Sequence, residues 1–149
     1  MRFWDASALV PLVVAETSST WARSLFEADA EVIVWWATPV ECVSAIARLE
    51  REGELTPTRA SFATRDLDEI AANWTEISPG EAIRSRARRL LRVHALRTAD
   101  ALQLAAALFA AEGHPATLPL VTLDERLANA AEKEEFPVMR FSQTPARGT

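Results

Sequence analysis

The chain has 149 residues, of which 49% are hydrophobic and 25% charged; this composition is typical of one globular domain and excludes a disordered or fibrous chain. Its formal net charge of −5 argues against a protein that coats nucleic acid with a uniformly basic surface. The single cysteine, Cys42, excludes an internal disulfide and suits a reducing cytoplasm.

The apolar run over residues 8–15 is interrupted by Pro11 and is much shorter than the ~20 residues that a membrane-spanning helix needs. No basic region precedes this run, as it would in a signal peptide. We therefore expect neither a signal peptide nor a membrane segment, and we expect a cytoplasmic protein.

The first part of the chain alternates strands with helices. Residues 2–10 (RFWDASALV) are expected to form a strand followed by a turn. Helical spacing of the apolar residues predicts a helix over 18–28. The β-branched and aromatic run at 31–36 predicts a buried strand, in which Trp35 and Trp36 point to opposite faces and both belong to the core.

The segment 38–52 carries strong helix signals. Thr38 is a natural N-cap, and Pro39 stands at the first helical position, where its missing N–H does no harm. Gly53 is expected to end the helix, and Cys42 lies on its apolar face, so we assign the thiol to the core and give it no chemistry.

The rest of the chain continues the alternation, with helices over 56–74, 78–94, 98–112 and 123–135 and strands over 75–77, 118–122 and 136–141. The 98–112 helix is apolar nearly all round and should be buried. The apolar residues of the 56–74 helix are assigned mainly to the core and secondarily to a dimer interface: Phe62, Leu67, Ile70 and Trp74.

Strands that alternate with helices, with connections too long for hairpins, predict a mostly parallel sheet with helices on both faces. We expect one α/β domain over residues 1–141, with four to five strands in the sheet. The last residues, 142–149, are expected to form a disordered tail.

Four carboxylates follow strand ends or begin helices in this scheme: Asp5, Glu41, Asp100 and Asp124. The carboxyl ends of parallel strands and the starts of the following helices share one edge of the sheet, where ligands bind. Acids that converge there repel one another and need a cation. Carboxylate oxygens favour a hard divalent ion, Mg²⁺ or Mn²⁺, over zinc, because neither His94 nor His114 lies in a ligand-like cluster.

Structural roles compete with a metal role for each acid. Glu41 with Thr38 matches a helix capping box, and Asp124 matches an N-cap, with TLDE at 122–125 as another possible box. An acid such as Asp100 on an apolar helix needs a partner. The alternative for Asp5, which has no capping role inside a strand, is a buried ion pair with an arginine.

Basic charge is concentrated in the segment RSRARRLLRVHALR, which holds Arg84, Arg86, Arg88, Arg89, Arg92 and Arg97. For most of these arginines a solvated helix face is the simplest interpretation. Arg97, which lies three residues before Asp100, is the best candidate for a contact with a substrate bound at the acids.

The segments FWDASALVPLVVAE, TPVECVSAIARLEREG, LRTADALQLAAAL and VTLDERLANAAE together resemble the PIN-domain family, and most closely the VapC-type toxins of type II toxin–antitoxin pairs. They run in the family's order from residue 3 to about the last strand. The resemblance implies a small nuclease with a central parallel sheet and an acidic cluster that binds Mg²⁺ or Mn²⁺.

The resemblance assigns the metal and catalytic acids to Asp5, Glu41, Asp100 and Asp124, with supporting hydroxyls at Ser7 and Thr122. It implies an endoribonuclease that hydrolyses RNA phosphodiester bonds with metal-activated water, leaving 5′-phosphate and 3′-hydroxyl ends. It also implies a homodimer that is silenced by a small VapB-like antitoxin, whose C-terminal segment occupies the active-site groove.

Other functions remain open at this point. A PIN nuclease of RNA processing or repair would carry the same acids. A receiver-like or dehalogenase-like phosphotransferase also places Mg²⁺ and aspartates at a sheet edge, but it needs a lysine beside the phosphoryl group, and the only lysine here is Lys133. A non-catalytic binding module would use the acids only as helix caps.

Overall fold

The computed structural model describes residues 1–142. Five parallel strands form one sheet in the order β3-β2-β1-β4-β5. Their bounds are β1 (Arg2–Trp4), β2 (Val32–Trp35), β3 (Thr75–Ile77), β4 (Leu120–Val121) and β5 (Val138–Met139). The predicted parallel sheet is confirmed. Of the predicted tail over 142–149, residues 143–149 lie outside the described part of the chain.

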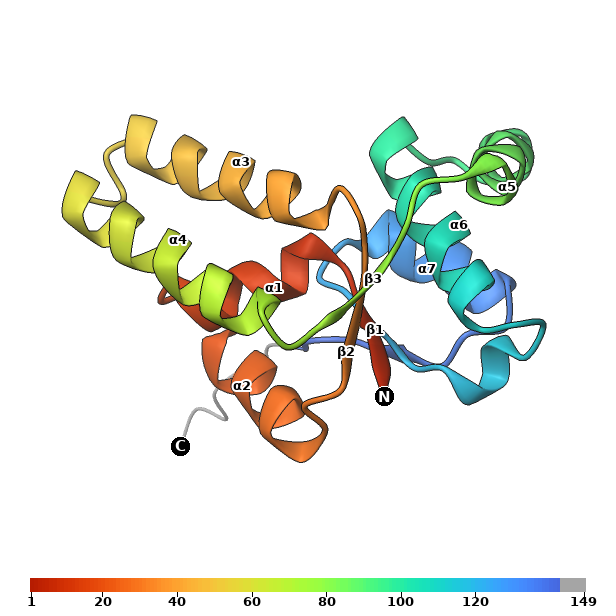
Figure 1. Cartoon of the computed structure of the whole chain (residues 1–149), viewed down its shortest axis with the longest axis horizontal. Helices are drawn as coiled ribbons and strands as arrows, with labels where there is room; N and C mark the ends of the chain where they lie inside the picture. Colours follow the sequence, from red (N-terminus) through yellow and green to blue (C-terminus); the bar gives the residue numbers. More distant parts are fainter. Residues whose placement is uncertain (143–149) are drawn as a thin grey trace, which may run out of the picture.

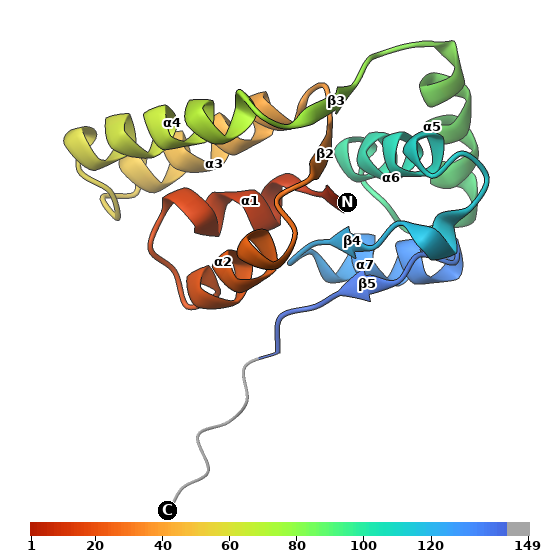
Figure 2. The same ribbon diagram turned by 60° about the horizontal axis from the view of Figure 1, so that its bottom comes forward.

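Helices cover both faces of the sheet, as the alternation predicts. Figure 1 shows one group on each side of the strands, and the turned view in Figure 2 agrees. On one side lie α1 (Ala6–Val13), α2 (Ser19–Ala28), α3 (Thr38–Arg51) and α4 (Pro57–Ala71). On the other lie α5 (Glu81–Val93), α6 (Thr98–Ala110) and α7 (Glu125–Lys133), with a short 3₁₀ turn, η1 (Pro115–Thr117), before β4.

Alternation of side chains along the strands divides the core in two. In β1, Phe3 packs against the α5–α7 side and Trp4 against the α1–α4 side, and both are fully buried. We call the cluster on the α5–α7 side the first core cluster and the one on the α1–α4 side the second. In β2, Ile33 and Trp35 belong to the first cluster and Val32 and Val34 to the second. Successive strand residues point to opposite faces, so the central strands β1 and β2, which are covered on both sides, are apolar at these positions.

The prediction of a turn after the first strand is wrong. Residues Ala6–Val13 form α1, a helix with Pro11 inside it. Proline in a helix interior costs about 3 kcal/mol, but Leu9 and Val10 of this helix are buried in the second core cluster. Burial of the apolar run offsets that cost, and the chain enters the helix directly at Asp5.

Two aromatic side chains are more exposed than expected. Trp36, assigned to the core, follows the end of β2 and has 54% of its surface exposed. Phe62 of α4 is 48% exposed, whereas Leu67 of the same helix is buried as predicted. Cys42 is fully buried, and burial raises the pKa of its thiol to about 12, so its assignment to the core is confirmed.

Within residues 1–142, no helix has the length and apolar character needed to cross a lipid bilayer.

Candidate active site

The four predicted acids come from four elements that meet at the carboxyl end of the sheet. Asp5 directly follows β1, Glu41 lies in the first turn of α3 after β2, Asp100 lies in the first turn of α6, and Asp124 precedes α7 after β4. β1 pairs with both β2 and β4, so the ends of these three strands are neighbours. α6 packs against β2, which brings its first turn to the same edge.

Asp5 is the most deeply buried of these acids, with 4% of its surface exposed. Its Oδ2 accepts a hydrogen bond from Ser7 Oγ at 2.5 Å and another from Thr122 Oγ1 at 2.9 Å. Burial raises the pKa of Asp5; these two hydroxyls oppose the shift, and the charge of Asp124 adds to it. No arginine of residues 1–142 pairs with Asp5, so the alternative of a buried ion pair is wrong.

The two hydroxyls that hold Asp5 are themselves tied to the loop that begins α7. Ser7 Oγ accepts a hydrogen bond from the backbone N–H of Leu123 at 2.9 Å, and Thr122 Oγ1 accepts one from the N–H of Asp124 at 3.0 Å. Ser7 and Thr122 therefore fix the start of α7 against the end of β1. Both predicted supporting hydroxyls lie at the acids.

Asp124 is an N-cap, as the competing interpretation predicted. Its Oδ1 accepts a hydrogen bond from the N–H of Leu127 at 3.0 Å. The cap uses one carboxylate oxygen, and the charge of Asp124 still raises the pKa of Asp5 and of Asp100. The structural role and the place in the acid cluster are therefore compatible.

Glu41 is not part of a capping box, because the helix starts one residue earlier than expected. Ala37 is the N-cap of α3, and the Thr38 side chain caps nothing. Instead, Gln103 Nε2 donates to Thr38 Oγ1 at 3.1 Å and to Glu41 Oε2 at 3.0 Å. Burial raises the pKa of Glu41 to about 7; Gln103 opposes the shift, and the charges of Asp5 and Asp100 add to it.

Asp100 is half-buried and feels charges of both signs. Burial, followed by the charges of Asp124 and Asp5, raises the pKa of its carboxyl to about 6, and Arg97 and Arg126 oppose that shift. Each of the four carboxylates thus acts on, or is acted on by, at least one other member of the set. All four acids lie at the carboxyl edge of the sheet, and their role as a metal site stays a prediction.

A family model described as "PIN domain" matches residues 2–133. The chain is 36% identical over 130 residues to "Ribonuclease VapC45" of Mycobacterium tuberculosis (strain CDC 1551 / Oshkosh) and to "Ribonuclease VapC49" of Mycobacterium tuberculosis (strain ATCC 25618 / H37Rv). Each match covers 87% of this chain and 88% of the relative. The chain belongs to the PIN-domain family.

Solved structures show the fold of this PIN domain in two other organisms. "Crystal Structure of PAE2754 from Pyrobaculum aerophilum" matches with a TM-score of 0.63 at 19% identity, over 93% of this chain and 87% of that one. "Crystal Structure of FitAcB from Neisseria gonorrhoeae" matches with a TM-score of 0.62 at 15% identity, over 95% and 97%. At these identities the similarity concerns the fold alone.

The donor set of the PIN domain fits a hard divalent cation in its chemistry. It offers four carboxylates and two hydroxyls, all oxygen donors. Burial, and after it the repulsion between the acids, raises the pKa of three of them, and a cation would offset both effects. Within residues 1–142, no three His, Cys, Asp or Glu side chains are close enough to form a complete ligand group as they stand. Mg²⁺ commonly keeps several waters and uses only one or two protein carboxylates, so such a complete group is not required.

Sequence reasoning missed two residues of this PIN domain's site. Gln103 is fully buried and braces Glu41, and Arg126 acts on Asp100. A signal for Gln103 was present, since it is the one polar residue in the apolar run ALQLAAAL and lies three positions after Asp100, on the same helix face. Arg97, the predicted substrate contact, is exposed and does act on Asp100.

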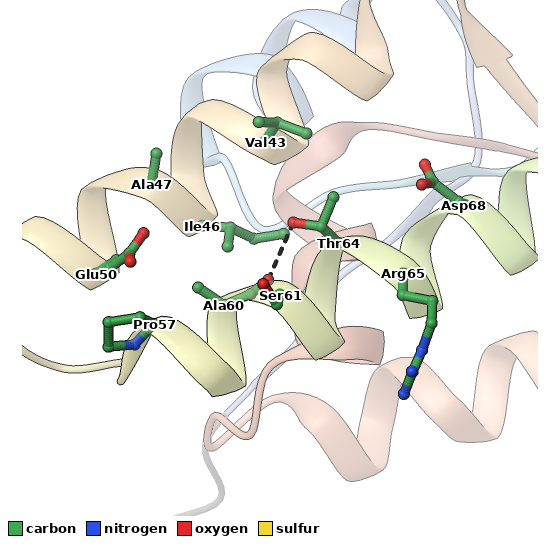
Figure 3. Close-up of a pocket in the computed structure, with 10 residues that line it drawn as sticks. All are labelled: Val43, Ile46, Ala47, Glu50, Pro57, Ala60, Ser61, Thr64, Arg65 and Asp68. Carbon is green, nitrogen blue, oxygen red and sulfur yellow. Dashed lines mark hydrogen bonds between the residues drawn. The ribbon is translucent and has the colours of Figure 1, made fainter.

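A separate hollow of about 520 Å³ lies between α3 and α4 of the PIN domain. Figure 3 shows Ile46 of α3 facing Ala60 and Thr64 of α4, with Glu50 and Asp68 toward opposite ends of the hollow. None of the four acids lines this hollow in the described structure. It is a mixed apolar and polar surface, distinct from the acid cluster.

Proposed function

We propose that this PIN domain is a Mg²⁺- or Mn²⁺-dependent endoribonuclease and the toxin of a toxin–antitoxin pair. The observation that carries the proposal is the convergence of Asp5, Glu41, Asp100 and Asp124 at one sheet edge, with the pKa of three of them raised by burial and by one another. The names of the relatives, which are VapC ribonucleases, support RNA as the substrate.

Asp5, Asp100 and Asp124 would hold the ion, and Glu41 would hold or deprotonate the attacking water. A bound Mg²⁺ or Mn²⁺ supplies charge that lowers the pKa of water and stabilises the negative charge that develops on the phosphodiester. Ser7 and Thr122 both bond Oδ2 of Asp5, which orients the carboxylate and directs its Oδ1 away from these bonds.

Glu41 is suited to proton transfer near neutral pH. Its pKa of about 7 lies close to the working pH, where a general base is most effective. In the proposed reaction the carboxylate of Glu41 takes a proton from water while the water oxygen attacks phosphorus. The bond from phosphorus to the 3′ oxygen breaks, and this oxygen takes a proton from solvent water, which leaves 3′-hydroxyl and 5′-phosphate ends.

Partner surfaces are consistent with the toxin role. Exposed apolar side chains stand near Glu41 in sequence on α3 and after the end of β2, namely Val40 (70% exposed), Val43 (43%) and Trp36. We propose that a VapB-like antitoxin and a second copy of the chain cover such surfaces, as the VapC names of the relatives suggest. We propose that the protein acts in the cytoplasm, where RNA, the antitoxin and Mg²⁺ are present.

The test is cleavage of a labelled RNA by the purified chain with EDTA, Mg²⁺, Mn²⁺ or Ca²⁺. We expect cleavage with Mg²⁺ and Mn²⁺ only, with products that carry 5′-phosphates. Equal cleavage in EDTA, or no cleavage with either ion, would contradict the proposed nuclease. If the chain cleaves RNA but its expression does not arrest growth, the housekeeping PIN nuclease is the better function.

The rival functions predict other results. A phosphotransferase would be labelled on an aspartate by acetyl phosphate, and its helping lysine would have to be Lys133, at the far end of α7 from Asp124. A non-catalytic module would show no thermal shift with Mn²⁺. We propose neither, because a buried carboxylate such as Asp5, whose side chain caps no helix, has no role in a simple binding module.

A further inference from the structure

One face of α7 carries positive charge. This face begins beside Asp124 of the acid cluster and extends along the helix to Lys133. Arg126, Asn129 and Lys133 are spaced three and four residues apart, so they share a face of the helix, and all three are exposed. Arg126 stands two residues after Asp124, and Lys133 lies about 10 Å farther along the helix axis. Lys133, the chain's only lysine, therefore lies on the same face of α7 as Arg126, which stands two residues after Asp124.

This face borders a small hollow of about 170 Å³. Its lining comes from α7 and from the segment that joins α5 to α6, and consists of His94, Ala95, Arg126, Asn129, Ala130 and Lys133. The hollow adjoins the acid cluster, because its Arg126 stands two residues after Asp124 at the start of α7. Its His94 and Ala95 lie in the segment that leads through Arg97 into α6, the helix of Asp100.

Carboxylates near the hollow are already paired. Glu134 accepts from Arg89 at 2.9 Å, and its Oε1 lies 3.2 Å from His94 Nε2. Beside this face, Arg140 pairs with Glu125 at 2.5 Å and with Glu132 at 3.0 Å, and it donates to Asn129 Oδ1 at 3.0 Å. Arg126 and Lys133, by contrast, form no salt bridge within residues 1–142. Both side chains are exposed, and no carboxylate of the described residues holds either one in a salt bridge.

A second hollow, of about 490 Å³, continues this basic surface on α5. It is lined by Ser85, Arg88, Arg89, Arg92 and Val93. The two hollows meet at Glu134, which Arg89 of the larger hollow and His94 of the smaller one both contact. Positive side chains therefore run from the acids along α7 and on to α5, in a chain whose net charge is −5.

We propose that these two hollows form a track for the phosphates of single-stranded RNA on one side of the cleavage site, with Arg126 and Lys133 as its first two contacts. The inference rests on the proposed nuclease function and adds the path that the bound RNA strand follows from the acids across the protein surface. Arginine and lysine bind phosphate through charge and several N–H donors, whereas the acid cluster itself repels RNA in the absence of a cation. A basic surface separate from the acids can therefore bind the phosphates while the acids bind the cation.

The test measures RNA binding as a function of salt, with cleavage silenced by Asp5→Asn in every arm. A fluorescent single-stranded RNA of mixed sequence is titrated at pH 8 with the full chain carrying Arg126→Gln and Lys133→Gln. The matched control carries Arg23→Gln and Arg59→Gln, exposed arginines of α2 and α4 that remove the same charge elsewhere. Thermal unfolding checks that both double variants fold.

We expect the slope of log affinity against log salt to fall by about 1.4 in the α7 double variant, since each phosphate contact of a single strand contributes about 0.7. The corresponding loss of affinity is roughly twentyfold at 0.1 M salt. The control double variant should keep the slope of its parent. Equal slopes in the two double variants would overturn the track.

Two further outcomes separate this inference from the function on which it rests. If the chain with Asp5 intact fails to cleave RNA with Mg²⁺ or Mn²⁺, the nuclease proposal fails, while a reduced slope would still establish the track. If RNA binding is unchanged but a poly-glutamate peptide binds the parent and not the α7 double variant, an acidic protein segment is the occupant and the RNA track is wrong.

Discussion

Gln103 Nε2 lies 3.0 Å from Glu41 Oε2 and donates a hydrogen bond to it, although the two residues are 62 positions apart in the chain. Gln103 is fully buried on α6, three residues after Asp100, and it also donates to Thr38. One helix therefore contributes an acid to the site and a brace for a second acid on α3. The brace stabilises the charged form of Glu41.

Replacing this brace should move the pH dependence of activity. Gln103→Leu removes the hydrogen bond that opposes the raised pKa of Glu41, so that pKa should rise above its present value of about 7. We expect the acid limb of the kcat profile for RNA cleavage to shift to higher pH, with activity recovering toward wild type near pH 9. A loss of activity that is equal at every pH would contradict the positioning role.

Thr64→Val is a matched control for that variant. Thr64 Oγ1 donates to the carbonyl oxygen of Ala60 at 3.0 Å within α4, in the hollow shown in Figure 3. The change removes one side-chain hydrogen bond at a place remote from the acids. Its pH profile should coincide with that of the wild type.

Removing the charge of Asp5 should uncouple activity from stability. Asp5→Asn keeps an oxygen that Ser7 and Thr122 can bond, but it removes a buried negative charge beside Asp124. We expect divalent-dependent RNA cleavage to fall at least about a hundredfold, since even indirect supports of a metal site are worth 10–100-fold. Without metal, the melting temperature should stay the same or rise.

The control for this variant is Asp68→Asn, at an exposed position of α4. It removes the same charge without touching the acid cluster and should leave cleavage unchanged. If the Asp5→Asn variant cleaves the same RNA at the wild-type rate, Asp5 has no part in the proposed mechanism.

The sequence predicted the sheet and the place of the acids because both depend on patterns that are local. β-branched runs, proline after a threonine and long apolar helices identify the elements, and a parallel sheet then brings Asp5, Glu41, Asp100 and Asp124 to one edge. Local patterns failed where a tertiary contact decides. The helix α1 forms around Pro11 because its apolar residues are buried.

The capping box at Glu41 failed for the same reason. Thr38 and Glu41 have the spacing of a box, yet both take their hydrogen bonds from Gln103, a residue on another helix. A single sequence holds the signal that Gln103 is unusual in an apolar helix, but its partners depend on how α6 packs. Trp36 was misassigned because the strand ends one residue before it, and strand ends follow from pairing with β3.

Stability without metal should fall as the pH rises. The pKa of Asp100 is raised from its ordinary value of 3.8 to about 6 and that of Glu41 from 4.5 to about 7, so the native state holds protons that the unfolded chain has released. This contribution to stability is complete below pH 4 and is lost as the pH passes through 6 and 7. Thermal unfolding in EDTA between pH 4 and 8 measures it.

Two comparisons isolate the acids from other titrating groups. Asp100→Asn should remove the part of the pH dependence centred near pH 6. Mn²⁺ should raise the melting temperature more at pH 8 than at pH 5, because the ion binds deprotonated carboxylates. The same Mn²⁺ shift at both pH values would contradict the assignment of these acids to the ion.

The helix that carries Asp100 should depend on its buried leucine. Leu104 of α6 is fully buried and lies one turn after Asp100. Leu104→Ala should lower the free energy of unfolding by about 3 kcal/mol, the usual cost of a cavity in a core. Leu91→Ala on α5 is the control, because Leu91 is 40% exposed, and its cost should be below about 1 kcal/mol. Urea unfolding measures both, and equal losses would contradict the core position of Leu104, since only a side chain enclosed on all sides leaves a cavity behind.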